Sequence, residues 1–398
     1  MSADNNFDQC LKCTICTAYC PVLAVNPEFP GPKRGGPDQE RLRLKNADYF
    51  EASLKYCLNC KRCEVSCPSG VRVGDIIQKA RIKNEGMPKL RDAMLANTDL
   101  VGSMSTMVAP IVNATIGLPP VKFILDAVMK IDKRRTFPKY SFGTFRSWFK
   151  RQEKKQLQFD KQISYFHGCY VNYNNPQLGK DFVKVMNALG YGVVPLEKEK
   201  CCGVALIANG LIKQAKSNAK KNLISIRKSV AEKRKVVSTS STCAFTIRDE
   251  YNHLLEFDNA DIRDSFETAT RFVFNILEKE GVEKLKFKNK KLKIAYHTPC
   301  HMEKLGWSNF SIGLLRMIPN VEVVVLGSNC CGISGTYGFK KENYEYSQKI
   351  GAPLFKEIES GDFDFVASDC ETCKWQIEMS TSKLCHHPIS VLADMLED

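Results

Sequence analysis

The sequence predicts an α/β protein in which a mostly helical, cysteine-rich module precedes two copies of a domain with a parallel sheet. Three observations support this prediction. Two cysteine motifs of identical spacing lie within residues 1–69. Further cysteine motifs after residue 160 recur at an almost constant offset. Between these later motifs, short β-branched segments alternate with amphipathic ones, a pattern typical of parallel sheets.

Composition narrows the class of protein. The 398 residues include 18 cysteines, and a chain of this length is not a small secreted disulfide scaffold. Residues 1–8 are polar and acidic, so we expect no secretory signal, and cysteines that act as metal ligands in a reducing cytoplasm. The 58 basic residues against 44 acidic ones leave a net charge of +14, which favours an anionic partner such as nucleic acid, acidic lipid or an acidic protein.

The N-terminal cysteines form two C-x2-C-x2-C-x3-C-P motifs. In proteins with two such motifs, three cysteines of one motif and the fourth of the other surround each iron–sulfur cluster. The spacing therefore predicts one [4Fe–4S] cluster on Cys10, Cys13, Cys16 and Cys67, and a second on Cys57, Cys60, Cys63 and Cys20. Structural zinc is the alternative, but zinc needs neither the third evenly spaced cysteine nor the proline. We expect the apolar neighbours to exclude water: Leu11, Ile15, Val22, Leu58, Val65 and Val71.

The rest of this first part contains turn and helix signals. Residues 26–38, NPEFPGPKRGGPD, are rich in proline and glycine, so we expect turns and no long regular structure. Helical patterns follow around Glu40–Tyr56 and Asp75–Asn84.

The C-terminal part contains an internal repeat. Cys169 corresponds to Cys300, Cys201-Cys202-Gly203 to Cys330-Cys331-Gly332, and Cys243 to Cys373, at offsets of 131, 129 and 130 residues (300 − 169, 330 − 201 and 373 − 243). Three matches near one offset indicate a duplicated domain.

Each copy contains strand and helix signals around its cysteines. The predicted strands are Tyr191–Leu196, Lys235–Ser240, Ile294–His297 and Val321–Gly327, and the predicted helices are Asp181–Gly190 and Phe310–Ile318. The cysteines follow the strand ends, which is the edge where open parallel sheets bind ligands.

The middle of the chain is strongly basic. Residues Lys122–Lys155 contain eleven basic and three acidic residues, a net of +8, interleaved with Phe137, Tyr140, Phe142, Phe145, Trp148 and Phe149. This mixture favours an anionic membrane surface, whereas nucleic acid is disfavoured because no RNA-binding motif accompanies it. The uncharged run Leu100–Val121 contains three prolines, so we do not expect it to span a membrane. We expect buried loop and short helix there, or a surface that touches a partner or lipid.

Longer stretches resemble a known family. NPEFPGPKRGGPDQERLRLK, HGCYVNYNNPQLGKD, EKCCGVALIANG, HTPCHMEKLGW and CCGISGTYGFKKENY are similar to the iron–sulfur subunits of anaerobic glycerol-3-phosphate dehydrogenases. Glycolate oxidase and heterodisulfide reductase subunits share this plan of a two-cluster ferredoxin-type domain and two Cys-Cys-Gly domains. The resemblance implies an electron-transfer subunit without its own catalytic site. It would serve a flavin-containing catalytic subunit and a second dehydrogenase subunit, and pass electrons to a membrane quinone. From the basic, aromatic run Lys122–Lys155 and the lack of a spanning segment, we expect the chain to lie peripherally on the cytoplasmic face of the inner membrane.

The resemblance also implies ligand sets in the repeats. The second repeat has the full family set of Cys300, Cys330, Cys331, Cys370 and Cys373, which can hold an iron–sulfur cluster in relatives. In the first repeat Ser240 replaces one cysteine, leaving Cys169, Cys201, Cys202 and Cys243 for zinc or an iron–sulfur cluster. A metal-free pair of domains with buried cysteines is the alternative. His167, His297 and His301 are candidate ligands or proton donors, or ordinary core residues, and Cys385, His386 and His387 read as structural.

These signals divide the chain into four parts. They are a two-cluster domain at 1–85, a basic connecting segment at 86–160, a first Cys-Cys-Gly domain at 161–290 and a second at 291–398. The absence of a nucleotide-binding glycine motif and of a hydrolytic triad favours an electron carrier. Alternatives are the iron–sulfur component of a glycolate or lactate oxidase, a heterodisulfide-reductase-like complex and a zinc scaffold.

Overall fold

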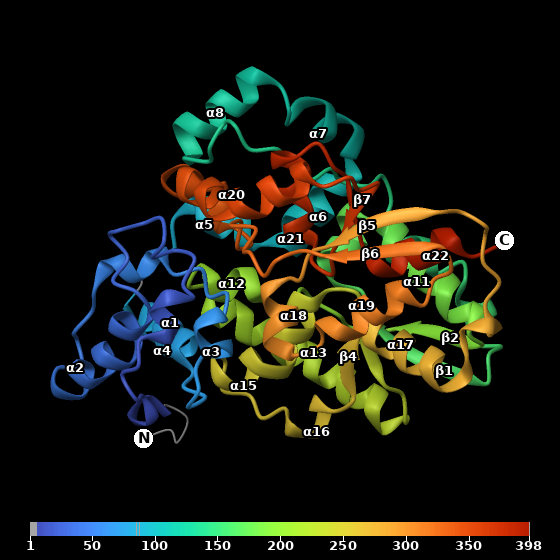
Figure 1. The fold of residues 1–398 in the computed structure, drawn as a ribbon, viewed down its shortest axis with the longest axis horizontal. Helices are drawn as coiled ribbons and strands as arrows, with labels where there is room; N and C mark the ends of the chain where they lie inside the picture. The colour runs from blue at the N-terminus through green and yellow to red at the C-terminus, as the bar shows by residue number, and fades with distance from the viewer. Residues whose placement is uncertain (1–5, 85, 87, 398) are drawn as a thin grey trace.

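The computed structural model describes residues 6–84, 86 and 88–397, and it confirms the predicted fold class. A mostly helical N-terminal module precedes two four-stranded parallel sheets (Figure 1). The first sheet has the order β2-β1-β3-β4 and the second β6-β5-β7-β8. The strands are β1 (Lys161–Phe166), β2 (Tyr191–Pro195), β3 (Val236–Ser238), β4 (Phe266–Thr268), β5 (Leu292–Tyr296), β6 (Val321–Val325), β7 (Phe365–Ala367) and β8 (Cys385–His386).

Helices connect the strands of each repeat, as the alternating pattern predicts. Those of the first repeat are α11 (Pro176–Ala188), α12 (Val204–Ala208), α13 (Ile212–Ala231), α14 (Ser241–Phe245), α15 (Tyr251–His253), α16 (Ala260–Arg263) and α17 (Ala269–Glu280). Those of the second are α18 (Cys300–Leu305), α19 (Ser308–Arg316), α20 (Tyr344–Ser360), α21 (Glu371–Ser380) and α22 (Pro388–Met395).

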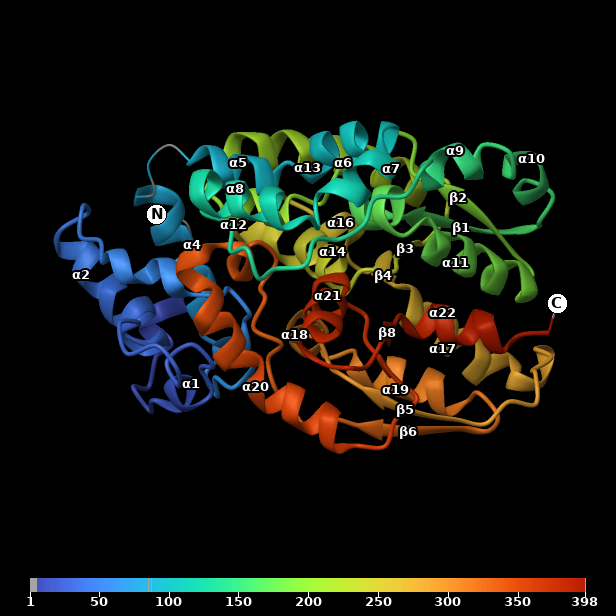
Figure 2. The same cartoon turned by 90° about the horizontal axis from the view of Figure 1, so that it is seen from above.

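The two repeats share one hydrophobic core. Helix α11 packs against α22, and α17 packs against α19, so helices of both repeats form a layer between the two sheets (Figure 2). Tyr165, Phe182, Ile294, Tyr296 and Leu392 are all buried in this core. The sheets therefore hold a fixed relative position, and so do the cysteines at their edges.

The N-terminal module contains α1 (Ile15–Ala18), α2 (Gln39–Lys45), α3 (Arg62–Val65) and α4 (Val73–Asn84). The helix predicted at Asp75–Asn84 is confirmed. The one predicted around Glu40–Tyr56 ends at Lys45, because Asn46 is extended and its side chain accepts a hydrogen bond from the Asp48 N–H.

The stretch 26–38 agrees with its prediction over 26–31, which contain no helix or strand, and differs from it in the glycine-rich part that follows. Residues Arg34–Asp38 form a helical turn of π type that continues directly into α2. A Cβ on Gly35 would lie 2.8 Å from Leu54, and one on Gly36 would lie 2.8 Å from Val73. The glycines therefore permit close helix packing here, rather than marking a turn-rich loop.

The connecting segment is largely helical, with α5 (Leu90–Ala96), α6 (Thr98–Met107), α7 (Ala109–Thr115), α8 (Pro119–Met129), α9 (Phe145–Phe149) and α10 (Glu153–Gln156). The run Leu100–Val121 forms short helices, but much of it is exposed rather than buried. In the part of the chain that the structure describes, no single helix has the length and hydropathy to cross a membrane, although α7 and α8 meet those criteria as a pair bent by 85°.

A buried ion cluster joins the N-terminal module to both repeats. Lys61 Nζ contacts Asp75, and it lies 3.7 Å from Glu64 and 3.9 Å from Glu250 of the first repeat. Lys304 of the second repeat lies 2.9 Å from Glu64. Burial disfavours the charge on Lys61, but the three carboxylates outweigh burial and raise its pKa. The module is therefore held at a defined position relative to both sheets.

We predict that Lys61→Met destabilises the protein, because it leaves carboxylates buried without their cation. Breaking a buried pair in this way costs about 3–5 kcal/mol. The matched control is Lys228→Met, since Lys228 forms an exposed ion pair with Glu197, and such pairs contribute about 0.2–1 kcal/mol. Anoxic denaturant titration of both variants measures the difference. Equal transition midpoints for the two would contradict the role assigned to Lys61.

Candidate metal centres

The two N-terminal cysteine loops have the same backbone conformation. In the first loop Lys12 and Thr14 have φ values of 57° and 62°, and in the second Asn59 and Lys61 have 53° and 64°. Left-handed residues at these equivalent positions curl each loop, so that its three thiols approach one point. A short helix, α1 or α3, then begins within each loop.

The structure brings the eight cysteines together in the two sets that the sequence predicts. Burial raises the pKa of the Cys16 thiol, and the nearby thiols of Cys10, Cys67 and Cys13 raise it further. Burial likewise raises the pKa of Cys20 to about 12, with further contributions from Cys60 and Cys57. Cys63 belongs to this second set, since its pKa is raised by burial and then by Glu64, Cys60, Cys57 and Cys20.

The two sets differ in their exposure to solvent. The second set lines a small, mainly apolar pocket walled by Val22, Leu58 and Ile77. Near the first set, Cys13 and Leu11 are exposed, as are Ile15 and Val65. The predicted apolar shielding is therefore confirmed for Val22, Leu58 and Val71 and wrong for Leu11, Ile15 and Val65. Four thiols around one cavity fit a cubane cluster, and the first set lies closer to the surface.

The five predicted cysteines of the second repeat also meet at one place. Cys300 follows β5, Cys330 and Cys331 follow β6, and Cys370 and Cys373 follow β7. The Cys300 and Cys330 sulfurs are 3.9 Å apart, and those of Cys331 and Cys373 are 3.2 Å apart. A hydrogen bond from Cys373 lowers the pKa of Cys370 to about 6. Gly332 has φ 83°, and a Cβ there would lie 2.1 Å from the Ser347 carbonyl oxygen, so only glycine allows this turn.

The first repeat holds its four cysteines in the equivalent arrangement. The pKa of Cys201 is lowered by hydrogen bonds with Cys169 and then Cys202, and Cys202 in turn bonds with Cys243. Ser240, in the place of the fifth cysteine, accepts from the Cys243 N–H at 3.1 Å and donates to Glu371 of the second repeat. Ser240 is therefore a helix cap and an inter-repeat contact in this structure.

The sequence reasoning missed three charged residues at the first repeat. Asp99 of α6 accepts a hydrogen bond from the Cys201 N–H at 2.7 Å, and burial raises the pKa of Asp99 to about 6. Glu199 is buried, which raises its pKa to about 8, and it accepts from the Gly168 N–H. Arg146 donates to His167. Glu199 lies two residues before the Cys-Cys pair, so its proximity to that motif could have identified it from the sequence. Asp99 and Arg146 come from the connecting segment, far from the motif in the sequence.

The second N-terminal set adjoins the second repeat. The pKa of Cys300 is raised by hydrogen bonds with Cys330 and then with Cys60. Cys300 and Cys330 lie in the same buried cluster as the N-terminal cysteines. Arg62, beside Cys63, donates to the Ser328 hydroxyl at 2.8 Å and so holds α3 against the loop after β6. Two of the four candidate centres are thus in direct contact.

The two repeats also meet through their cysteine edges. The Thr242 hydroxyl lies 3.8 Å from the Cys370 sulfur, and the Cys169, Cys243 and Cys370 side chains line a common pocket with Glu371. His387 also lines this pocket and caps α22 by accepting from the Ile389 N–H at 3.1 Å. Cys385 is fully buried in β8. These observations agree with a structural role for both residues.

Most of the aromatic residues predicted to face a membrane within Lys122–Lys155 are buried or half-buried, whereas most of the basic side chains of this run are exposed. Phe145 and Phe149 are buried in the core shared by the repeats, and Phe137 packs against the second repeat. Arg135 is 0% exposed, and Arg134 is paired with Asp132 and Glu345. Among the predicted aromatic residues Phe142 is exposed. The prediction of exposed rings was wrong for the other aromatic residues. This part of the segment packs against both repeats, and its rings contact apolar side chains there.

Comparison with known proteins agrees with this arrangement. The 4Fe-4S dicluster domain model matches residues 6–71, and the cysteine-rich domain model matches 163–248 and 294–378. The chain is 58% identical to a subunit of the anaerobic glycerol-3-phosphate dehydrogenase of Escherichia coli K12, over 99% of both chains. It is 24% identical to the E. coli glycolate oxidase iron-sulfur subunit, over 100% of this chain and 96% of the relative.

A more distant relative also matches over most of its length. The chain is 24% identical to a subunit of the dihydromethanophenazine:CoB–CoM heterodisulfide reductase of Methanosarcina barkeri, over 92% of this chain and 87% of the relative. The predicted iron–sulfur character and the Cys-Cys-Gly duplication are therefore confirmed, and the chain belongs to the family of iron–sulfur subunits of anaerobic glycerol-3-phosphate dehydrogenase.

Proposed function

We propose that this chain carries electrons from a flavin-containing catalytic subunit, which oxidises sn-glycerol 3-phosphate to dihydroxyacetone phosphate, to a quinone in the membrane. The complex is completed by a second dehydrogenase subunit. The chain lies peripherally on the cytoplasmic face of the inner membrane. The observation that carries this proposal is the contact between Cys60 and Cys300, because it joins the N-terminal cysteine sets to the repeats.

The cysteine sets follow one another in a line. The first N-terminal set, which includes the exposed Cys13, adjoins the second set within one small module. Cys60 of that second set contacts Cys300, and Cys370 of the second repeat faces Thr242 and Cys243 of the first. Bound metal clusters would supply one-electron redox chemistry at these sets. The residues of the chain hold the sets in contact and keep the inner ones dry.

Electrons enter at the exposed end of this line. Leu11 is 71% exposed and Tyr19 is 59% exposed, and both lie within the first cysteine motif, on either side of Cys13. Exposed apolar side chains next to a redox site suit a protein partner that must approach closely. We assign this surface to the flavin-containing subunit.

Electrons leave next to an apolar surface on α6, α7 and α8, which we call the α6–α8 face. Its large exposed side chains are Leu100, Met104, Met107, Val108, Ile111, Leu118, Phe123, Ile124 and Val128. Asp99, which accepts from the Cys201 N–H, belongs to α6 and precedes Leu100. The first-repeat cysteines are thus tied to the helix that begins this face.

The α6–α8 face supports peripheral attachment to lipid better than the mostly buried or half-buried aromatic residues between Phe137 and Phe149 do. It is apolar over three consecutive helices, and Lys130 and Lys133 are exposed just after α8. Apolar side chains with lysines at the border suit the interface of an anionic membrane. A quinone dissolved in that membrane would then lie near the first repeat.

We predict that Cys13→Ser and Cys60→Ser have different spectroscopic effects. Anoxically isolated protein should contain at least about eight iron and eight sulfide per chain from the two N-terminal sets. Each substitution should damage one cluster and interrupt quinone reduction by the complex. Only Cys60→Ser should also alter the spectrum of the second-repeat centre, since Cys60 contacts Cys300. Metal analysis and electron paramagnetic resonance of both variants measure this, and the same second-repeat spectrum in both would contradict the proposed order.

We predict that Ile111→Glu combined with Phe123→Glu weakens membrane binding at least about a hundredfold. Each side chain contributes about 1.5–3 kcal/mol when it is transferred from water to an apolar environment, and about 1.4 kcal/mol corresponds to a tenfold change. Co-sedimentation with phosphatidylglycerol and phosphatidylethanolamine vesicles measures the change.

The matched control for this membrane variant is Ile224→Glu on α13, since Ile224 is 59% exposed but lies outside the α6–α8 face. It should bind vesicles like the unmodified chain. If the double variant binds vesicles normally but loses the dehydrogenase subunits, the α6–α8 face is a subunit interface, and the membrane assignment is wrong.

A further inference from the structure

His297 has no hydrogen-bond partner in the described part of the chain. It follows β5 directly, its side chain is 1% exposed, and both of its ring nitrogens are buried and unpaired. More than about 90% of buried polar groups in folded proteins are paired, because a buried group left unpaired loses its hydrogen bonds to water without replacement. Two unpaired nitrogens on one ring therefore indicate that a ligand belongs beside it.

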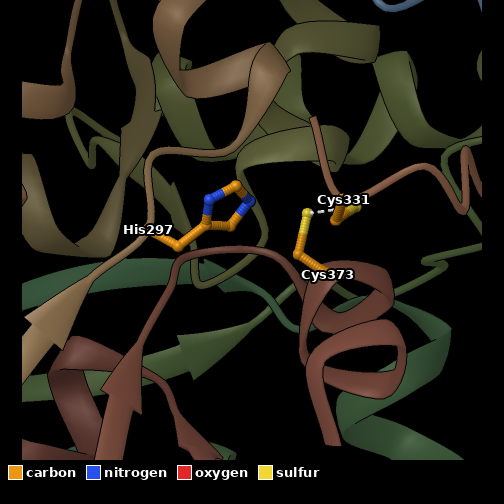
Figure 3. A group of neighbouring side chains, drawn as sticks. All are labelled: His297, Cys331 and Cys373. Carbon is orange, nitrogen blue, oxygen red and sulfur yellow. Dashed lines mark hydrogen bonds between the residues drawn. The ribbon is translucent and has the colours of Figure 1, made fainter. Parts of the chain in front are cut away.

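The position of His297 identifies what that ligand is. A ring nitrogen and the sulfurs of Cys331 and Cys373 all lie within 4.8 Å of one another. Figure 3 shows the imidazole turned toward these two sulfurs, which are 3.2 Å apart. Metal–sulfur bonds of about 2.3 Å and metal–nitrogen bonds of about 2.0–2.1 Å bring such donors to this separation around one ion.

The corresponding histidine of the first repeat, His167, has partners for both of its ring nitrogens. His167 accepts a hydrogen bond from Arg146 Nε at 2.9 Å, and its Nδ1 lies 3.2 Å from Glu199 Oε1 and 2.8 Å from the Gly168 carbonyl oxygen. His301, beside Cys300, has Nδ1 3.2 Å from the Thr242 hydroxyl and stacks on Phe245. Of these three histidines, His297 is therefore the one whose ring nitrogens are available to bind a metal.

We propose that His297 is a nitrogen ligand of the metal centre in the second repeat, next to Cys331 and Cys373. This inference rests on the proposed metal site of that repeat, and adds a ligand that its five-cysteine pattern does not contain. A neutral imidazole brings less negative charge to a centre than a thiolate does, and histidine ligation raises the potential of iron–sulfur centres relative to all-cysteine ligation. This ligand therefore makes the second-repeat centre easier to reduce.

The test uses the full chain, loaded anoxically and labelled with ¹⁵N-histidine. Pulsed electron paramagnetic resonance of the reduced second-repeat centre should show a strong histidine nitrogen coupling in the unmodified protein. The coupling should persist in His167→Ala, the matched control, and disappear in His297→Ala. If the metal is zinc, X-ray absorption at the zinc edge should lose its nitrogen at about 2.0–2.1 Å in His297→Ala only. Unchanged spectra in His297→Ala would overturn the proposal.

A second variant distinguishes the loss of a nitrogen ligand from misfolding of the protein. His297→Cys should retain the metal but lower the reduction potential of the centre, so that the ratio of reduced to oxidised centre at a fixed potential falls at least tenfold, which is 59 mV for one electron. An unshifted potential would count against nitrogen ligation. Cys331→Ala separates the two proposals. If it leaves metal content unchanged, the second-repeat site itself is wrong; if it removes metal while His297→Ala changes nothing, only the histidine assignment fails.

Discussion

The arrangement of the whole molecule depends on the buried ammonium group of Lys61. It lies in the loop that carries Cys57, Cys60 and Cys63, and its carboxylate neighbours come from that module and, through Glu250, from the first repeat. Glu64 extends the cluster to Lys304 of the second repeat. A buried charge is tolerated only when its partners are in place, so this cluster admits few relative positions of the three parts. The contact between Cys60 and Cys300 follows from it.

Duplication supplied two similar cysteine pockets, and the differences between them lie in the residues around the thiols. The first pocket has Ser240 in place of a fifth cysteine, and Asp99, Glu199 and Arg146 form hydrogen bonds around it. The second keeps five thiols and leaves His297 unpaired beside them. The same backbone therefore places two carboxylates and an arginine beside four thiols in one copy, and an unpaired imidazole beside five thiols in the other. Such surroundings tune the chemistry of a metal centre as much as its ligands do.

The connecting segment shows why composition alone misjudged a surface. A run of lysines, arginines and aromatic rings has the makeup of a membrane interface, but Phe145 and Phe149 belong to the common core and Arg135 is buried in the second repeat. The exposed apolar side chains lie instead on α6, α7 and α8, which belong to the earlier part of the same connecting segment. Amphipathic residues suit both interiors and interfaces, and only the packing partner decides between them.

Local chemistry in the sequence predicted how the cysteines group and determined the fold class. Cysteine spacing and the following prolines predicted how the eight N-terminal thiols divide, and strand–helix alternation with a constant repeat offset predicted two parallel sheets with thiols at their carboxyl edges. These features depend on neighbours within a few residues, or on a period. The approach of Cys60 to Cys300, the burial of Arg135, the exposure of α6–α8 and the unpaired ring of His297 were decided by tertiary structure alone. Each depends on segments tens to hundreds of residues apart, whose contacts are set by packing and by buried charge rather than by local sequence.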